Sequence, residues 1–276
     1  VVLPKGLTNI PSYAFTECPK LNNLVVPNTV TSIESYAFDK LDGLTNLVFE
    51  RADETNKATL TLNTKSIHHC YALPTLTLSD RITSIPQNCV FACDELKTVN
   101  ISASVTTIKS QAFYAYYGLT TVNIEDVNMP IYEGETNGKP SQLTRLEYNA
   151  FYDSIKLTTI NLPDTITSMG SLVFGNSAIE HLTVPSGLVS TGDATFAFMP
   201  KLRSVDFRGY KTTAIGGNAF RSCTALETVV LPPSVVTINY EAFFDCASLK
   251  TVSINVYPND YADEAKRGKS DLQSIM

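Results

Sequence analysis

The chain repeats one pattern of apolar and polar positions along nearly its whole length. An Ala-Phe pair, or a close variant of it, is followed about six residues later by Leu and three residues further on by Leu, Val or Ile. The anchor residues of these pairs are Phe15, Phe38, Phe91, Phe113, Phe151, Phe174, Phe196, Phe220 and Phe243. Six of the eight intervals between them are 22 to 24 residues long. This regular spacing predicts a solenoid of stacked turns.

The interval of 53 residues between Phe38 and Phe91 holds one further, degenerate unit. In it Ile67 takes the anchor position and Leu73 the following leucine position. A charged insertion near residues 50–58 lengthens the same interval and is typical of a solvated loop. Including this unit, we expect about ten turns.

The interval of 38 residues between Phe113 and Phe151 is one period plus an insertion near residues 125–144. Interruptions of a solenoid project from one face, and long surface loops are where binding residues concentrate. Met129, Ile131 and Tyr132 give this insertion apolar contact area in an acidic setting. We therefore take these three residues as candidate ligand contacts.

One turn is well represented by residues 21–38. Its Leu-x-x-Leu-x-Val segment alternates as a half-buried strand does, and a second short apolar pair, Val30 and Ile33, follows after a proline. A tight helical turn is expected to carry the Ala-Phe pair, with Phe inside and the small Ala allowing close approach of the next turn. The fold class predicted is a strand-dominated α/β solenoid of 22–24-residue turns, each with one parallel strand, a short second strand and a tight helical turn.

The repeat predicts a single solenoid over residues 1–256, because the pattern runs through to that point. The polar segment 257–276 departs from it and is expected to be a C-terminal cap or a linker. Residues 2–4 already match the end of a repeat strand, so we expect the sequence to begin inside the array. An export signal or anchor would then lie outside this chain.

Composition narrows the possible partners. Hydrophobic residues make up 43% of the chain and charged residues 17%, which suits a continuous core. The net charge is −6 and lysines and arginines are scattered singly, so no basic stripe for nucleic acid is present. The sequence contains no run of about 18 apolar residues, which a membrane-spanning helix would need. We expect a monomer that binds neither nucleic acid nor membrane.

Five of the six cysteines follow the repeat. Four lie three residues after an anchor position and a fifth, Cys93, lies two residues after Phe91. These four are Cys18, Cys70, Cys223 and Cys246. Because a free Cys is one of the most buried residue types, we expect small thiols that face the core.

Metal and catalytic chemistry find little support in the sequence. His68, His69 and Cys70 are ligand types, but neighbouring positions of an extended chain point in opposite directions, and no Cys-x-x-Cys pair is present. Nucleophile-elbow, P-loop and dinucleotide-binding motifs are absent. We therefore expect no enzyme, no cofactor and no metal site.

Outward strand positions form two columns of short polar residues, mostly Thr and Asn. Next to the long insertion they are Thr121, Asn123, Thr159 and Asn161, which we take as further candidate ligand contacts. Such columns also stabilise a parallel sheet by themselves. Protein-binding hot spots favour Trp, Tyr and Arg, and these columns contain none.

The units at residues 30–38 and 215–226 resemble the leucine-rich repeats of the BspA-like family, through their frame of Ile, Ala-Phe, Cys and Leu. The resemblance covers about residues 2 to 256. It implies a leucine-rich-repeat solenoid from a bacterial protein that is exported to the cell surface or secreted.

The resemblance also implies a non-enzymatic role in adhesion, with an extended repeat surface that binds a protein of the host matrix or of a bacterial surface. The alternative is a glycan-binding module of a surface polysaccharide system. A hydrolase with its site in the insertion is a third hypothesis. The shared residues are core residues, so the family brings no catalytic residue to this chain.

Overall fold

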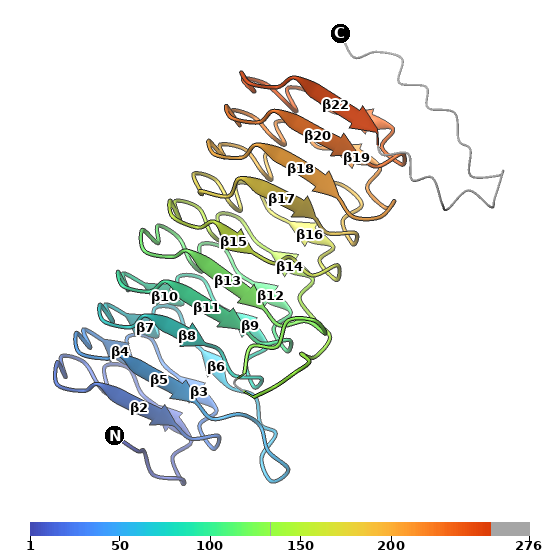
Figure 1. Cartoon of the computed structure of the whole chain (residues 1–276). Helices are drawn as coiled ribbons and strands as arrows, with labels where there is room; N and C mark the ends of the chain where they lie inside the picture. Colours follow the sequence, from blue (N-terminus) through green and yellow to red (C-terminus); the bar gives the residue numbers. More distant parts are fainter. Residues whose placement is uncertain (133, 255–276) are drawn as a thin grey trace.

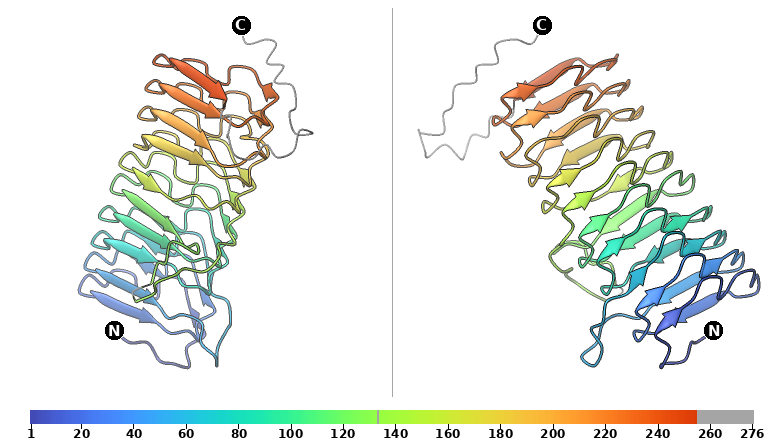
Figure 2. Two further views of the ribbon diagram at one scale, coloured as in Figure 1. Left: turned by 45° about the vertical axis from the view of Figure 1, so that its right-hand side comes forward. Right: turned by 180° about the vertical axis from the view of Figure 1, so that it is seen from behind.

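The computed structural model describes residues 1–132 and 134–254, which form a solenoid of stacked turns (Figure 1). The repeating turn has three edges: a main strand, a short second strand and a turn that carries the anchor residue. In one turn the second strand is reduced to the isolated bridge at Ser190. All pairing between named strands is parallel and joins one turn to a neighbouring one, as the two further views in Figure 2 make visible. The predicted strand-dominated solenoid is confirmed.

The main strands are β2 (Asn23–Val26), β5 (Asn46–Phe49), β8 (Thr75–Thr77), β11 (Thr98–Ile101), β13 (Thr121–Ile124), β15 (Thr159–Ile160), β17 (His181–Val184), β18 (Ser204–Phe207), β20 (Thr228–Leu231) and β22 (Thr251–Ile254). Val2 adds a further rung, because it bridges to Val25 of β2. The main face of the described chain thus has about eleven rungs, one more than the ten expected, because the start of the chain also contributes one.

The second edge consists of two-residue strands, which are β1 (Asn9–Ile10), β3 (Ser32–Ile33), β6 (Thr61–Leu62), β9 (Ser84–Ile85), β12 (Thr107–Ile108), β14 (Arg145–Leu146), β16 (Ser168–Met169), β19 (Ala214–Ile215) and β21 (Thr237–Ile238). The third edge holds β4 (Phe38–Asp39), β7 (Ile67–His68) and β10 (Val90–Phe91). No helix occurs in residues 1–132 and 134–254, and therefore none there could span a membrane.

The third edge turns tightly by means of left-handed backbone and not by a helix. In each of ten turns the residues two before and two after the anchor have φ between 48° and 62°. In the first turn the N–H groups of Tyr13, Phe15 and Glu17 donate to carbonyl groups of the next turn, at N···O distances of 3.0 to 3.2 Å. A helix would direct these N–H groups back into its own turn, so bonding between turns excludes it.

One predicted anchor is wrong by a single position. Val90 pairs with Ile67 and is buried, whereas Phe91 pairs with His68 and is only half-buried. The left-handed residues of this turn are Asn88 and Ala92, which are centred on Val90. The Ala-Phe signal misplaced the anchor because a phenylalanine happens to follow the buried valine.

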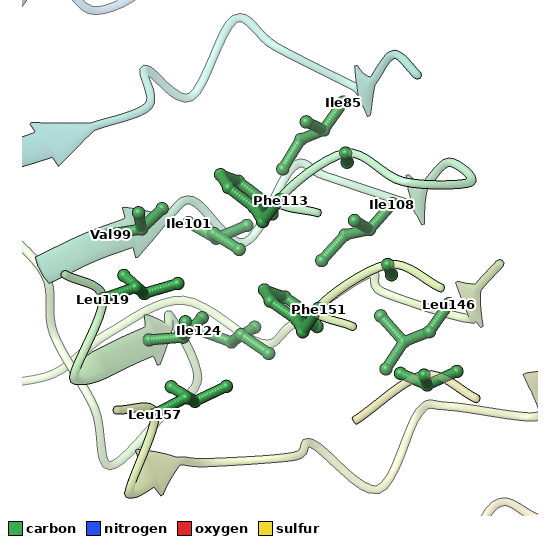
Figure 3. Packing of buried hydrophobic residues seen from close by; sticks show 14 of the residues in the cluster. Ile85, Val99, Ile101, Ile108, Phe113, Leu119, Ile124, Leu146, Phe151 and Leu157 are labelled. Atoms are coloured by element: carbon green, nitrogen blue, oxygen red, sulfur yellow. The ribbon is translucent and has the colours of Figure 1, made fainter. Parts of the chain in front are cut away.

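The phenylalanine anchors form a stack along the interior of the solenoid. Phe113 and Phe151 lie with ring centroids 5.3 Å apart and nearly parallel, and Phe151 and Phe174 continue the stack at 5.7 Å. Columns of aliphatic side chains from the main and second strands flank these rings (Figure 3). The Ala before the anchor is also buried at Ala37, Ala112, Ala150, Ala219 and Ala242, as predicted, whereas Ala14 before Phe15 is exposed.

The predicted columns on the main face are confirmed within three blocks of strands. Thr75, Thr98, Thr121 and Thr159 are partners in register across β8, β11, β13 and β15. Strand pairing stops between β5 and β8, and again between β15 and β17. The first interruption coincides with the charged insertion of residues 50–58, which separates two consecutive turns.

All six cysteines are unpaired thiols, and the position three residues after the anchor has a regular role. The thiols of Cys223 and Cys246 each donate to the carbonyl group of the anchor in the preceding turn, at 3.1 Å. With Val90 as anchor, Cys93 occupies the same position. Cys18 is exposed, contrary to expectation, since no anchor carbonyl group of an earlier turn covers it within the described residues.

The expected cap or linker at 257–276, together with residues 255–256 of the expected solenoid, lies outside the described residues.

Candidate ligand-binding site

Both insertions leave the solenoid after a main strand and meet on one edge of the molecule. Figures 1 and 2 show the loop after β5 and the loop after β13 next to one another. Asp80 lies where they meet. Its carboxylate accepts hydrogen bonds from the backbone N–H of Ala52 at 3.0 Å and from the side chains of Arg51 and Lys139, both at 3.3 Å. One carboxylate therefore ties the two insertions to the solenoid.

The charge of Asp80 is stabilised although its side chain is only 10% exposed. Burial by itself raises the pKa of this carboxyl group. The hydrogen bonds from Ala52 and Lys139 and the positive charge of Arg51 have the larger combined effect, so the pKa of Asp80 lies below its ordinary value. The carboxylate is ionised at neutral pH.

Arg51 and Tyr132 form the contact between the two insertions. The Arg51 guanidinium lies over the Tyr132 ring, 3.7 Å from its centroid, and pairs with Glu135 at 2.8 Å. The Tyr132 hydroxyl donates to the carbonyl oxygen of Leu78 at 3.3 Å. Burial raises the pKa of Tyr132 to about 12, so the hydroxyl keeps the proton that it donates. Both side chains are held in one orientation.

Each insertion is also fixed at its base. The buried Glu125 accepts hydrogen bonds from the backbone N–H groups of Ala103 and Lys139, at 2.9 and 3.0 Å. The fully buried Arg81 donates to carbonyl groups in both the first insertion and an earlier turn, including that of Ala58 at 2.9 Å. Buried polar groups with these partners limit the movement of both loops.

A groove of about 340 Å³ lies beside this junction, on the main face. It is lined by residues 45–51, Thr75, Thr77 and Tyr132. Its floor is the gap between β5 and β8, where no strand pairing is made, and its wall is the Tyr132 ring with Arg51. Val48 adds an exposed apolar side chain to the floor. A wider depression of about 820 Å³, with Asp80 and Lys139 in its lining, lies at the same junction.

The structure does not bring the seven predicted contact residues together. Tyr132 lines the groove, whereas the half-buried Met129 and Ile131 belong to the insertion but not to the groove lining. The insertion folds back toward the N-terminal turns, so Tyr132 contacts Leu78 after β8. The four predicted strand residues lie further along the solenoid than that contact. Thr121 and Asn123 are on β13, Thr159 is on β15, and Asn161 directly follows β15.

Many side chains of the polar columns hydrogen-bond to one another between neighbouring strands. The Asn123 amide donates to Asn100 at 2.9 Å, and the Asn100 amide donates to Thr77 at the same distance. The side chain of Asn161 makes hydrogen bonds in place of backbone strand pairing. It accepts from the N–H of Ile124 at 2.7 Å and donates to the carbonyl group of Ile124 at 2.6 Å. This ladder of amides ends at Thr77, in the lining of the groove.

Sequence reasoning missed Arg51 and Asp80. Arg51 was expected to be solvated, and Asp80 stands in an ordinary turn with no pattern of its own. One signal in the sequence could have shown that the two insertions lie near one another. Both follow a main strand, and this places them on the same edge of the solenoid. Which loop would fold back on the other was not encoded in any local pattern.

A second polar cluster lies on the third edge, and here the expectation that His68 and His69 point apart is wrong. The Nδ1 atoms of His68 and His69 lie 2.6 and 3.3 Å from one carboxylate oxygen of Asp39. The left-handed φ of 50° at His69 turns its ring to the side of His68. Burial lowers the pKa of His68, against the opposing effect of the Asp39 hydrogen bond.

Stacked parallel turns with leucines at fixed positions define a leucine-rich-repeat protein. The family model for the BspA type leucine-rich repeat region matches residues 8–134 and 138–250, with six copies. The chain belongs to this family. No curated protein matches it in sequence.

A solved structure shares the fold, and a second one is reported with it. A leucine-rich repeat protein from Bacteroides ovatus is 22% identical, with a TM-score of 0.55, and the match covers 90% of this chain and 73% of that one. A leucine-rich cell surface protein from Faecalibacterium prausnitzii is 20% identical over 93% of this chain and 88% of that one, with a TM-score of 0.42.

Proposed function

We propose that this chain is a non-enzymatic binding protein of the bacterial cell surface, or a secreted one, that holds an extended protein segment in the groove beside the insertion junction. The observation that carries the proposal is the convergence of both insertions on Asp80, which sets Tyr132 and Arg51 over the unpaired gap between β5 and β8. Membership of the BspA type family supports the surface location and an adhesive role, and the chain is proposed to act as a monomer.

The residue types at the groove support a protein ligand. Tyr and Arg are the side chains that most often dominate protein interfaces. Here the pairing of Arg51 with Glu135 and the bond from Tyr132 to Leu78 hold them in place before any ligand arrives. Such ordering reduces the entropy lost on binding. The uncharged Thr75 and Thr77 offer hydrogen bonds to a polypeptide backbone along the floor.

Glycan binding is the second candidate, and stacked tyrosines on the third edge favour it. Tyr13 and Tyr36 are parallel with centroids 5.4 Å apart, and Tyr114 and Tyr152 are parallel at 5.8 Å. Sugar rings stack on the free faces of aromatic rings, but each of these tyrosines uses one face on its neighbour. The groove Tyr132 likewise has its face against Arg51. Protein binding is therefore the leading proposal.

A direct test is to offer the purified chain to arrays of host-matrix proteins and of glycans, and to bacterial cells. We expect binding to a protein probe. Tyr132→Ala and Arg51→Ala should each weaken that binding by about 30-fold or more, because truncation of a central anchor costs roughly 2 kcal/mol. Tyr117→Ala is the matched control, since Tyr117 is 58% exposed and is not one of the residues that line the groove.

Three outcomes would count against the proposal. If the intact chain binds no protein probe, the adhesive role is wrong. If Tyr132→Ala and Arg51→Ala bind as tightly as the wild type, the groove is not the site. Binding to glycans alone, with loss of affinity on substitution of Tyr13 or Tyr114, would establish the second candidate instead.

A further inference from the structure

We propose that Asp39, His68 and His69 form a binding site for a divalent transition-metal ion of the zinc class. The three side chains offer two imidazole nitrogens and one carboxylate oxygen, which all lie within 4.8 Å of one another. Asp39 and His68 are buried, and the His69 side chain is 28% exposed. The site is separate from the groove, because it lies on the third edge of the turns.

The distances suit a small ion. Zinc bonds to imidazole nitrogen and carboxylate oxygen are about 2.0 to 2.2 Å long, so two ligands of a tetrahedral ion lie roughly 3.4 Å apart. The His69 nitrogen already lies 3.3 Å from the Asp39 oxygen. The His68 nitrogen lies 2.6 Å from the same oxygen and would have to move away by less than about 1 Å.

Strand pairing and ring contacts position these ligands. Asp39 and His68 are direct partners in the pairing of β4 with β7, so their Cα atoms stand side by side. The ring of Phe91 stacks on His68 with centroids 5.4 Å apart, and Tyr36 contacts the same ring edge-on at 5.0 Å. A site held by packed neighbours on strands loses little entropy when the ion binds.

The ligand set indicates which ions fit. Two nitrogens and one oxygen favour Zn²⁺, Co²⁺, Ni²⁺ or Cu²⁺ over Mg²⁺ and Ca²⁺, which prefer oxygen ligands. Three protein ligands leave a fourth position, and the partial exposure of His69 lets solvent fill it. Both imidazole rings are directed at the same carboxylate oxygen of Asp39, although one ring would be enough to give this oxygen a hydrogen-bond donor.

The ion would join the two turns that the first insertion separates. Asp39 belongs to the turn that leads into β5, and the two histidines belong to the turn that leads into β8. Strand pairing is missing between β5 and β8 themselves. A metal bond between these turns therefore replaces part of the cohesion lost at the gap.

The test uses the full chain in a Cys18→Ser background, because an exposed thiol such as that of Cys18 is a competing zinc ligand. The metal-free protein is titrated with Zn²⁺ by calorimetry, and with Co²⁺ while its visible absorption is recorded. We expect one ion per chain and the strong visible bands of tetrahedral Co²⁺. Thermal unfolding should shift to higher temperature with Zn²⁺ and not with Ca²⁺.

Three variants locate the site. His69→Ala and Asp39→Asn should weaken Zn²⁺ binding by more than about 100-fold. Loss of a residue that only hydrogen-bonds to a metal ligand weakens binding by up to about 100-fold, and loss of a ligand itself should have a larger effect. Asp39→Asn keeps the size of the side chain, so it protects the test against misfolding. His181→Ala is the control, since His181 is the remaining histidine and lies exposed on β17.

Absence of Zn²⁺ binding by the folded wild type would overturn the proposal. So would equal affinity in wild type, His69→Ala and Asp39→Asn, or a loss of affinity in His181→Ala alone. An equal thermal shift with Ca²⁺ would show a nonspecific charge effect and would also contradict it.

Discussion

Residues with left-handed backbone give every turn its third edge. The two such positions flank the anchor, and only glycine adopts this backbone without a steric cost. Asn and Asp tolerate it better than most residues, and they occupy six of the twenty positions. These six are Asn88, Asn149, Asp153, Asn176, Asn218 and Asp245. The other fourteen positions carry this cost, because bonds to the next turn hold the backbone in place.

Glycine should therefore stabilise the chain at such a position. Ala115 has φ of 59°, and its N–H donates to Tyr152 at 2.8 Å, a bond that glycine keeps. Ala115→Gly should raise the free energy of unfolding by about 0.5 to 1 kcal/mol. Ala115→Val should lower it, because β-branched residues avoid this conformation. Urea denaturation measures both.

Lys109→Gly is the control for this series, since Lys109 is exposed and its φ is not left-handed. There glycine should destabilise the chain by roughly 0.5 to 1 kcal/mol. Equal losses in Ala115→Gly and Lys109→Gly would show that the third edge does not have the backbone described.

At the scale of elements, the two insertions behave as one structure because Asp80 bonds both. Asp80→Asn removes the acceptor for Arg51 and Lys139, and should cost about 2 kcal/mol, the range for hydrogen bonds to charged groups. Hydrogen exchange should become faster in residues 50–58 and 127–139 while the rest of the solenoid is unchanged. Asp206→Asn is the control, because Asp206 is exposed on β18.

The same junction should weaken in acid. The pKa of Asp80 in the folded chain lies below the ordinary value of 3.8, so its stabilising effect is complete above that pH and is lost as the pH falls below it. Exchange in residues 50–58 should accelerate on acidification, after correction for the intrinsic rate, and Asp80→Asn should abolish this dependence. Acceleration that persists in Asp80→Asn would assign it to another carboxylate.

The sequence predicted the repeated elements well, but not every anchor position or the contact between the insertions. The strands, the degenerate turn at Ile67 and both insertions follow from a period that the core imposes on every unit. The anchor at Val90 was missed, because burial selects a position in the turn and not a particular side chain. The contact of Tyr132 with Arg51 was also missed, because residues far apart in sequence form it and no repeat constrains either loop.

At the scale of the whole molecule, the solenoid is a set of turns that each contact their neighbours. Stability in such arrays is roughly a sum of turns and interfaces. The main face is divided into three blocks, and the gap between β5 and β8 is spanned on the outside by the joined insertions. The groove thus lies at one of the two breaks in main-face pairing, and it is the break where the two insertions meet.

Hydrogen exchange of the intact chain, with and without the protein probe that it binds best, shows whether the groove holds the ligand. We expect slower exchange on binding in residues 45–51, 75–77 and 127–139, with β17 to β22 unchanged. Slower exchange confined to β17–β22 or to the third edge, with the groove segments unaffected, would contradict this expectation.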